Sequence, residues 1–82
     1  DINFIPEGDI ILSRNKDIPG VVGKVGTILG ESGVNIAEYI LSRPQKKETP
    51  ISIIKVDHGV NHECLEKLNE IEEIIEVQQF KI

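Results

Sequence analysis

The fold of this chain is decided by one stretch, Asn15-Lys-Asp-Ile-Pro-Gly20, which runs through a glycine-rich apolar segment into Gly33-Val-Asn-Ile36. The stretch predicts the end of one strand, a helix and the start of another strand. Pro19 suits the first helical position, because its missing N–H has no intrahelical partner there. Five aliphatic residues follow in one helical stripe, Val21, Val22, Val25, Ile28 and Leu29. Gly33 can supply a left-handed cap, so we expect a helix over residues 19–31.

The neighbouring segments predict further strands. Residues 9–14 contain three consecutive aliphatic residues, which is typical of a strand buried on both faces or nearly so. Residues 35–43 are strand-like, with a blurred alternation that suggests a bulge, and residues 51–57 form a β-branched run. Between them, residues 43–50 are polar and contain two prolines, which indicates a surface loop.

The C-terminal part predicts a second helix and a closing strand. Asn61 can cap the helix, because Asn side chains accept hydrogen bonds from helical N–H groups. The apolar stripe of this helix comprises Cys64, Leu65, Leu68 and Ile71. Residues 74–82 alternate as a strand does, with Val77 on one face and Phe80 and Ile82 on the other.

The order of these elements is β-α-β-β-α-β, which is the order of the ferredoxin-like α+β fold. Right-handed crossovers then place the first and third strands at the centre of a four-stranded antiparallel sheet. Both helices would cover one face of that sheet. We expect one domain over residues 9–82, with residues 1–8 as a lead-in from a preceding domain.

Composition excludes several classes of partner. The chain has 82 residues and a net charge of −5, so it lacks the basic surface that nucleic acids or anionic membranes require. No apolar run reaches the ~20 residues needed to span a bilayer. The single cysteine cannot form an internal disulfide. These features favour a cytoplasmic location.

Several residues around the first helix have the chemistry of an amino-acid site. A helix start attracts anions, because its first N–H groups lack partners and the macrodipole is positive there. Gly20 and Val21 would donate to a carboxylate, and Asp17 beside them could hold an ammonium group. Asn15 and Asn35 can each donate and accept. We expect the topology to bring these residues together with Pro19 as one ligand-binding site, which favours a small-molecule sensor over a catalyst.

Other motifs are weaker evidence for a binding function. The pair Gly23 and Gly26 matches the G-x-x-G of RNA-binding KH domains, but it falls inside the predicted helix of an acidic chain. With Gly30, these glycines more plausibly permit close packing on the sheet or on a partner helix. His58 and His62 are separated by turn and cap positions, so they need not face one metal ion. No metal site and no catalytic residue is predicted.

The run from Arg14 to Gly30, followed by Gly33-Val-Asn-Ile-Ala37, resembles the ACT domain family. The likeness covers about residues 9–82 and is closest to the C-terminal regulatory domains of D-3-phosphoglycerate dehydrogenases. Glu72-Glu73 stands where Pro-Gly is common in the family. We expect that difference to alter the last helix-to-strand turn and to leave the ligand site alone.

The resemblance implies a regulatory domain that binds L-serine as a feedback inhibitor, with NAD bound elsewhere in the longer enzyme and no cofactor in this chain. It also implies homodimers paired through an edge strand and the first helix, with ligands between the two copies. Asn15, Asp17 and Asn35 fall at the ligand-contacting positions. Two alternatives stay open, namely a dimerisation module that binds no ligand and the related ACT domain of L-serine dehydratases.

Overall fold

The computed structural model describes residues 8–16, 20–42 and 49–82. Its elements are β1 (Asp9–Asn15), α1 (Val21–Glu31), β2 (Ile36–Ser42), β3 (Ile51–Val56), α2 (His62–Asn69) and β4 (Ile74–Lys81). This is the predicted order of strands and helices. The predicted lead-in at residues 1–8 and the predicted loop at 43–50 lie largely outside the described residues.

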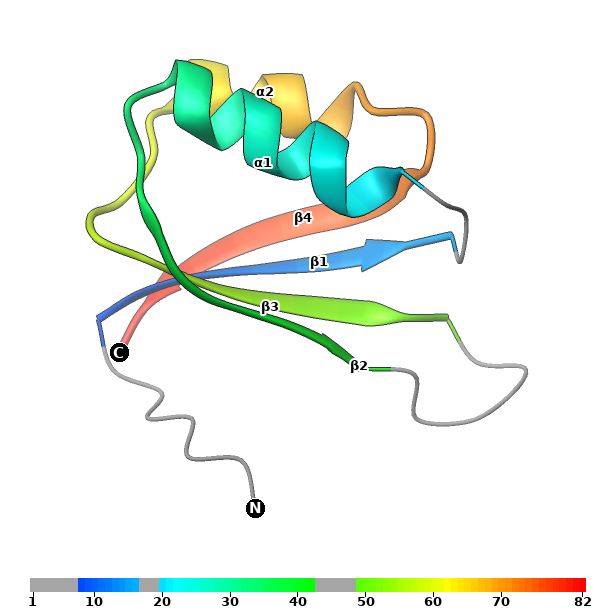
Figure 1. The fold of residues 1–82 in the computed structure, drawn as a ribbon, viewed down its shortest axis with the longest axis horizontal. Helices are drawn as coiled ribbons and strands as arrows, with labels where there is room; N and C mark the ends of the chain where they lie inside the picture. Colours follow the sequence, from blue (N-terminus) through cyan, green and yellow to red (C-terminus); the bar gives the residue numbers. More distant parts are fainter. Residues whose placement is uncertain (1–7, 17–19, 43–48) are drawn as a thin grey trace.

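The four strands form one antiparallel sheet in the order β2-β3-β1-β4. The first and third strands are central, as predicted, and β2 and β4 are the edges. Both helices lie side by side on one face of the sheet, with α2 close to β4 (Figure 1). The ferredoxin-like α+β prediction is therefore confirmed.

The core lies between this face and the two helices. Ile11 of β1 and Ile54 of β3 are almost completely buried under Leu29 of α1 and Leu68 of α2. The remaining buried members of the same cluster are Val21, Val25, Val34, Val56, Val60, Cys64, Ile71 and Ile74. Because side chains alternate along a strand, the neighbours of Ile11 and Ile54 point to the opposite face, which no described helix covers.

Helix α1 begins later than the sequence predicted. Gly20 occupies the cap position with φ 95°, and Val21 is the first helical residue. The prediction that Pro19 starts the helix is therefore wrong, and Pro19 itself lies outside the described residues. Val22 also leaves the predicted apolar stripe, because 48% of its surface is exposed on the flank of the helix.

The end of α1 confirms the predicted glycine cap. Gly33 has φ 75°, a conformation that costs a residue with a Cβ about 1–2 kcal/mol. The Val34 N–H donates to the Leu29 carbonyl at 2.9 Å, and the Gly33 N–H donates to the Gly30 carbonyl at 3.0 Å. These two bonds form a Schellman motif, which ends the helix and turns the chain toward β2.

Two other local predictions are confirmed. Asn61 caps α2, where its Oδ1 accepts a hydrogen bond from the Cys64 N–H at 2.8 Å. The register of β2 against β3 shifts between Ile36 and Glu38, which is the expected bulge. Neither described helix has the length and apolar character needed to cross a membrane.

Replacing Gly33 with alanine should lower the free energy of unfolding by about 1–2 kcal/mol, because alanine is strained at positive φ. Gly30→Ala is the matched control within the same helix end. It should raise stability by up to about 1 kcal/mol, since a Cβ there meets no atom within 4 Å. Urea denaturation of dilute protein measures both, and equal effects would contradict the cap assignment.

Candidate functional site

The start of α1 has the geometry of an anion site. No side chain of the described residues caps this end of the helix, and the first helical bond runs from the Lys24 N–H to the Gly20 carbonyl at 3.0 Å. The N–H groups of Val21, Val22 and Gly23 therefore precede the first helical hydrogen bond. They carry the positive end of the helix dipole. An anion of small size, such as a carboxylate, would be stabilised here.

Gly20 has a structural reason to be glycine that the sequence did not reveal. Its φ of 95° is accessible to glycine and strained for other residues, although a Cβ would meet no atom within 4 Å. The position therefore demands a particular backbone path into the helix. Open space beside Gly20 is also compatible with close approach of a ligand to the backbone.

Asn15 turns inward, away from solvent. Only 3% of its surface is exposed, and its Nδ2 donates to the Lys16 carbonyl at 3.0 Å. Its Oδ1 accepts a hydrogen bond from the Ser52 hydroxyl at 3.2 Å. The side chain thus ties the end of β1 to β3. Its amide groups are used within the protein and are not presented to a ligand.

The sequence analysis missed the polar residues around Asn15. Tyr39 donates from its hydroxyl to the Ser52 Oγ at 3.3 Å, so a chain of hydrogen bonds crosses β1, β3 and β2. Ser13 lies opposite Ser52 in the register, is 2% exposed and has no hydrogen-bond partner for its hydroxyl among the described residues. The sequence offered one signal of this polar cluster, namely a serine at an inward-facing position of an otherwise aliphatic strand.

Asn35 lies at the other end of the sheet. The Asp57 N–H donates to the Asn35 carbonyl, whereas the Asn15 N–H donates to the Pro50 carbonyl. These contacts mark opposite ends of β3, separated by roughly 20 Å of strand. The expectation that Asn15 and Asn35 converge within one chain is therefore wrong, because β1 and β2 run parallel and the end of one is far from the start of the other.

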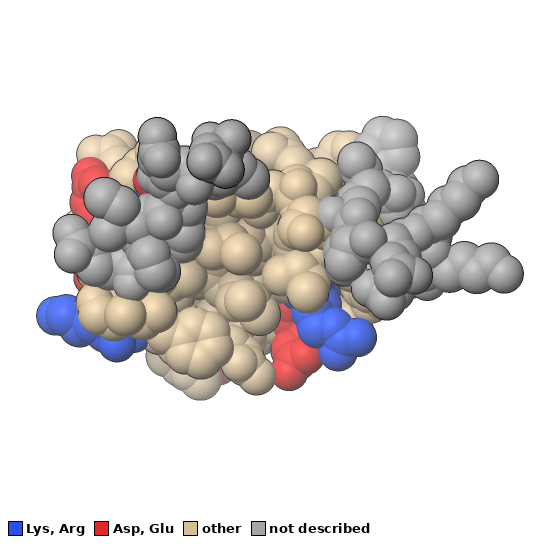
Figure 2. Space-filling model, turned by 90° about the horizontal axis from the view of Figure 1, so that it is seen from below, with Lys and Arg blue, Asp and Glu red and all other residues tan. Residues whose placement is uncertain are grey.

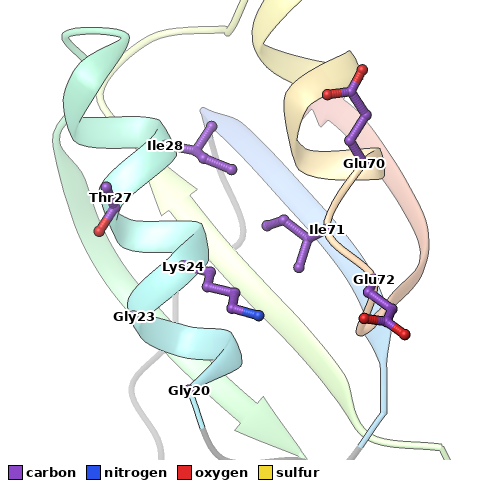
Figure 3. Close-up of a pocket in the computed structure, with 8 residues that line it drawn as sticks. All are labelled: Gly20, Gly23, Lys24, Thr27, Ile28, Glu70, Ile71 and Glu72. Carbon is purple, nitrogen blue, oxygen red and sulfur yellow. The ribbon is translucent and has the colours of Figure 1, made fainter.

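A groove borders the start of α1. It has a volume of about 640 Å³ and lies between α1 and the connection from α2 to β4. Ile28 and Ile71 face each other across it, Lys24 extends toward the same space, and Gly20 lines one end (Figure 3). The groove is of a size that small-molecule sites have in proteins.

An ion pair joins the two sides of this groove. The Lys24 Nζ lies 2.9 and 2.8 Å from the two carboxylate oxygens of Glu73. The hydrogen bond from Lys24 lowers the pKa of the Glu73 carboxyl from its ordinary value. The Glu73 carbonyl also accepts from the Lys16 N–H at 2.8 Å. Glu73 thus holds the first turn of α1, contrary to the expectation that Glu72-Glu73 would affect the turn alone.

The histidine and cysteine side chains pack or pair within the part of the chain that the structure describes. No group of three or more His, Cys, Asp or Glu side chains that could hold a metal ion occurs within residues 8–16, 20–42 and 49–82. Cys64 is buried in the core, at 1% exposure. His62 pairs with Glu66 on the outer face of α2, at 2.6 Å. Asp17, which the sequence assigned to an ammonium group, lies outside the described residues.

Asn15→Ala should lower the free energy of unfolding by about 1–3 kcal/mol, because the buried partners of Asn15 would lose a hydrogen bond. Asn35→Ala is the matched control, since Asn35 is exposed and its backbone carbonyl remains in place. Its effect should stay within about 0.5 kcal/mol. Urea denaturation measures both, and an equally small effect of Asn15→Ala would show that its amide is not structurally engaged.

The Glu73 carboxyl should titrate with a midpoint below 4.5 by carbon-detected NMR. Because its pKa is lowered on folding, the stabilisation from this group is present above pH 4.5 and is lost as pH falls through the lowered midpoint. Lys24→Met should raise the midpoint of Glu73. Lys67→Met removes an ammonium group that pairs with Glu63 on α2 and should leave that midpoint unchanged. Equal shifts in both variants would contradict the specific pairing.

Comparison with known proteins identifies the relatives of this chain. It is 35% identical over 77 residues to D-3-phosphoglycerate dehydrogenase of Methanocaldococcus jannaschii, and 37% identical over 78 residues to that of Archaeoglobus fulgidus. A chloroplastic D-3-phosphoglycerate dehydrogenase of Arabidopsis thaliana is 36% identical over 76 residues. These matches cover 93–94% of this chain but only 12–15% of each relative.

The fold is also found among solved structures. The structure described as GqqA, a novel type of quorum-quenching acylase, superposes with a TM-score of 0.60 at 20% sequence identity. The match covers 94% of this chain and 32% of that one, and at this identity it shows a shared fold alone. The ACT domain family model matches residues 10–73, and this chain therefore belongs to the ACT domain family.

Proposed function

We propose that this chain is the amino-acid-binding regulatory domain of a D-3-phosphoglycerate dehydrogenase and that its effector is L-serine. The observation that carries the proposal is the start of α1, where backbone N–H groups precede the first helical bond and no side chain among the described residues caps them. The dehydrogenase relatives favour this setting over an L-serine dehydratase. The NAD site of such an enzyme would belong to its other domains.

In the proposed complex, the serine carboxylate lies at the helix start, where Gly20 and Val21 donate from their backbone. Asp17 receives the serine ammonium group. Asn15 acts indirectly, because its buried amide holds the end of β1 beneath the site. An effector bound this way changes the enzyme only through a difference in affinity between two arrangements of the site.

Asn35 would come from a second copy. If two chains add side by side through β2 in antiparallel fashion, the start of the partner's β2 lies at the end of the sheet where α1 begins. That arrangement brings the amide of Asn35 in the second copy toward the serine. It also explains why a single chain holds Asn15 and Asn35 so far apart.

The glycines of α1 support pairing along this flank. Gly23, Gly26 and Gly30 each cost about 1 kcal/mol of helix propensity relative to alanine. A Cβ at any of them would meet no atom within 4 Å, so packing on the chain's own sheet does not require them. Close approach of a partner helix would explain why these three positions are glycine. The same observation favours a second function, a pairing module that forms dimers and binds no effector.

Isothermal titration with L-serine tests the proposal. Asp17→Ala should weaken binding at least tenfold, because loss of one charge-assisted hydrogen bond costs about 1.5–3 kcal/mol. Glu63→Ala, which removes an exposed carboxylate from the first turn of α2, is the matched control and should bind normally. Equal affinity in Asp17→Ala and the unmodified chain would refute the assigned role.

Mixing variants tests whether two copies share the site. Asp17→Ala and Asn35→Ala should each bind serine poorly alone. A mixed dimer would contain one site with both substitutions and one intact site, so mixing should restore tight binding to a fraction of the sites. Dimers that show no response to serine before or after mixing would favour the pairing module.

A further inference from the structure

The face of the sheet opposite the helices is apolar at its centre. The strand registers place six apolar side chains next to one another on it, Ile10, Leu12, Ile40, Ile51, Ile53 and Phe80. Ile10 is 4% exposed, whereas Phe80 is 43% exposed and the other four are partly exposed. Figure 2 views this side, and in the part not drawn in grey the centre is uncharged and the visible Lys, Arg, Asp and Glu lie toward the margins.

This pattern differs from that of a sheet with one face in water. Antiparallel sheets of that kind alternate apolar residues on the core side with polar residues on the outer side. Here β1 and β3 carry aliphatic residues on both faces. The three consecutive aliphatic residues Ile10, Ile11 and Leu12 indicate this in the sequence. An apolar centre with a polar rim is the arrangement of a protein interface.

The charges on this face balance one another. Arg14 pairs with Glu76 across β1 and β4, with 3.4 Å between Nη1 and Oε1. Glu38 lies beside Lys55 in the register of β2 and β3. Among the described residues, this face therefore carries two basic and two acidic side chains, although the whole chain has a net charge of −5.

We propose that this open face is an interface between two copies of this chain, stacked sheet on sheet. A second copy carries the same net charge, and repulsion between the two is smallest where each presents a neutral, apolar surface. A strongly basic partner would instead be drawn to the acidic surfaces. The interface is isologous, with the same patch on both copies.

The area of the face determines how strongly two stacked copies are expected to associate. Four strands about 4.8 Å apart and three rows of outward side chains cover roughly 400 Å² of flat area. A stable interface of standard size buries about 800 Å² per partner. The stack alone is therefore weak, and it gains strength when the proposed pairing through β2 joins two copies whose faces then stack together on those of a second pair.

Leu12 and Ile53 lie at the centre of the interface. They are register partners on the two central strands, so a two-fold axis through the middle of the face packs them on their own counterparts. Leu12→Lys would place two ammonium groups opposite each other in an apolar contact. Because Leu12 is partly exposed in the single chain, the substitution leaves the core between sheet and helices intact.

Sedimentation equilibrium of this chain up to millimolar concentration tests the proposal. We expect reversible self-association that Leu12→Lys weakens at least tenfold, since charges at the centre of an interface are most disruptive. Val22→Lys, on the exposed flank of α1, is the matched control and should leave the stacked contact in place. Circular dichroism verifies that both variants fold.

The outcomes separate this interface from side-by-side pairing. If both exist, the chain forms tetramers, and Leu12→Lys and Val22→Lys each reduce them to dimers. Association that Leu12→Lys does not alter would overturn the stacked interface and leave the pairing through β2 untouched. A chain that stays monomeric at millimolar concentration would overturn it as well, and would indicate that another part of a longer protein covers this face.

Cross-linking locates the contact directly. Cys64 is the only cysteine, so Cys64→Ala gives a background without thiols. In that background, Leu12→Cys should join two copies through a bismaleimide of about 10 Å, the separation of stacked sheets. Val22→Cys should not join them across the open face. Efficient cross-linking of Val22→Cys together with none of Leu12→Cys would contradict the stacked arrangement.

Discussion

The structure depends on the packing of α1 against the two central strands. Val21, Val25 and Leu29 are almost completely buried over Ile11 and Ile54. Full burial of each such side chain contributes about 1.5–3 kcal/mol. Three glycines within the same helix disfavour helix formation by about 1 kcal/mol each relative to alanine. The aliphatic contact therefore outweighs the poor helix propensity, and it lets glycine occupy three positions on one side of the helix.

That contact also positions the candidate site. Because α1 runs back across the sheet, its start lies at the end of β1. Beneath it, the hydrogen bonds among Asn15, Ser52 and Tyr39 tie three strands together. Beside it, Lys24 is held by Glu73. The uncapped N–H groups of the helix thus project from a well-supported base, which reduces the reorganisation needed when an anion binds.

In the proposed regulatory role, this domain would act through its surfaces. The chain spans 12–15% of the dehydrogenases that it resembles, and a small effector can act on the rest of such an enzyme only by favouring one arrangement of domains over another. Two regions that no described helix covers are suited to such contacts, the glycine-lined flank of α1 with the edge strand β2 and the open face of the sheet. They lie on different sides of the molecule, so one can form without the other.

Local patterns in the sequence determined most of the fold. Hydrophobic periodicity identified every strand and helix, and the caps at Gly33 and Asn61 and the bulge in β2 were recognisable because each depends on a few adjacent residues. The ACT domain family was also recognisable from the residues around the first helix. These features are local, so neighbouring residues suffice to specify them.

Tertiary structure alone decided how the candidate residues are placed. Asn15 looked available for a ligand, yet Ser52, distant in sequence, binds its amide and holds it inside. Asn35 seemed close to Asn15, yet parallel strands put the two at opposite ends of the sheet. Glu73 reached Lys24 through a fold-dependent contact. Strand direction and long-range pairing set these positions, and no short stretch of sequence encodes either of them.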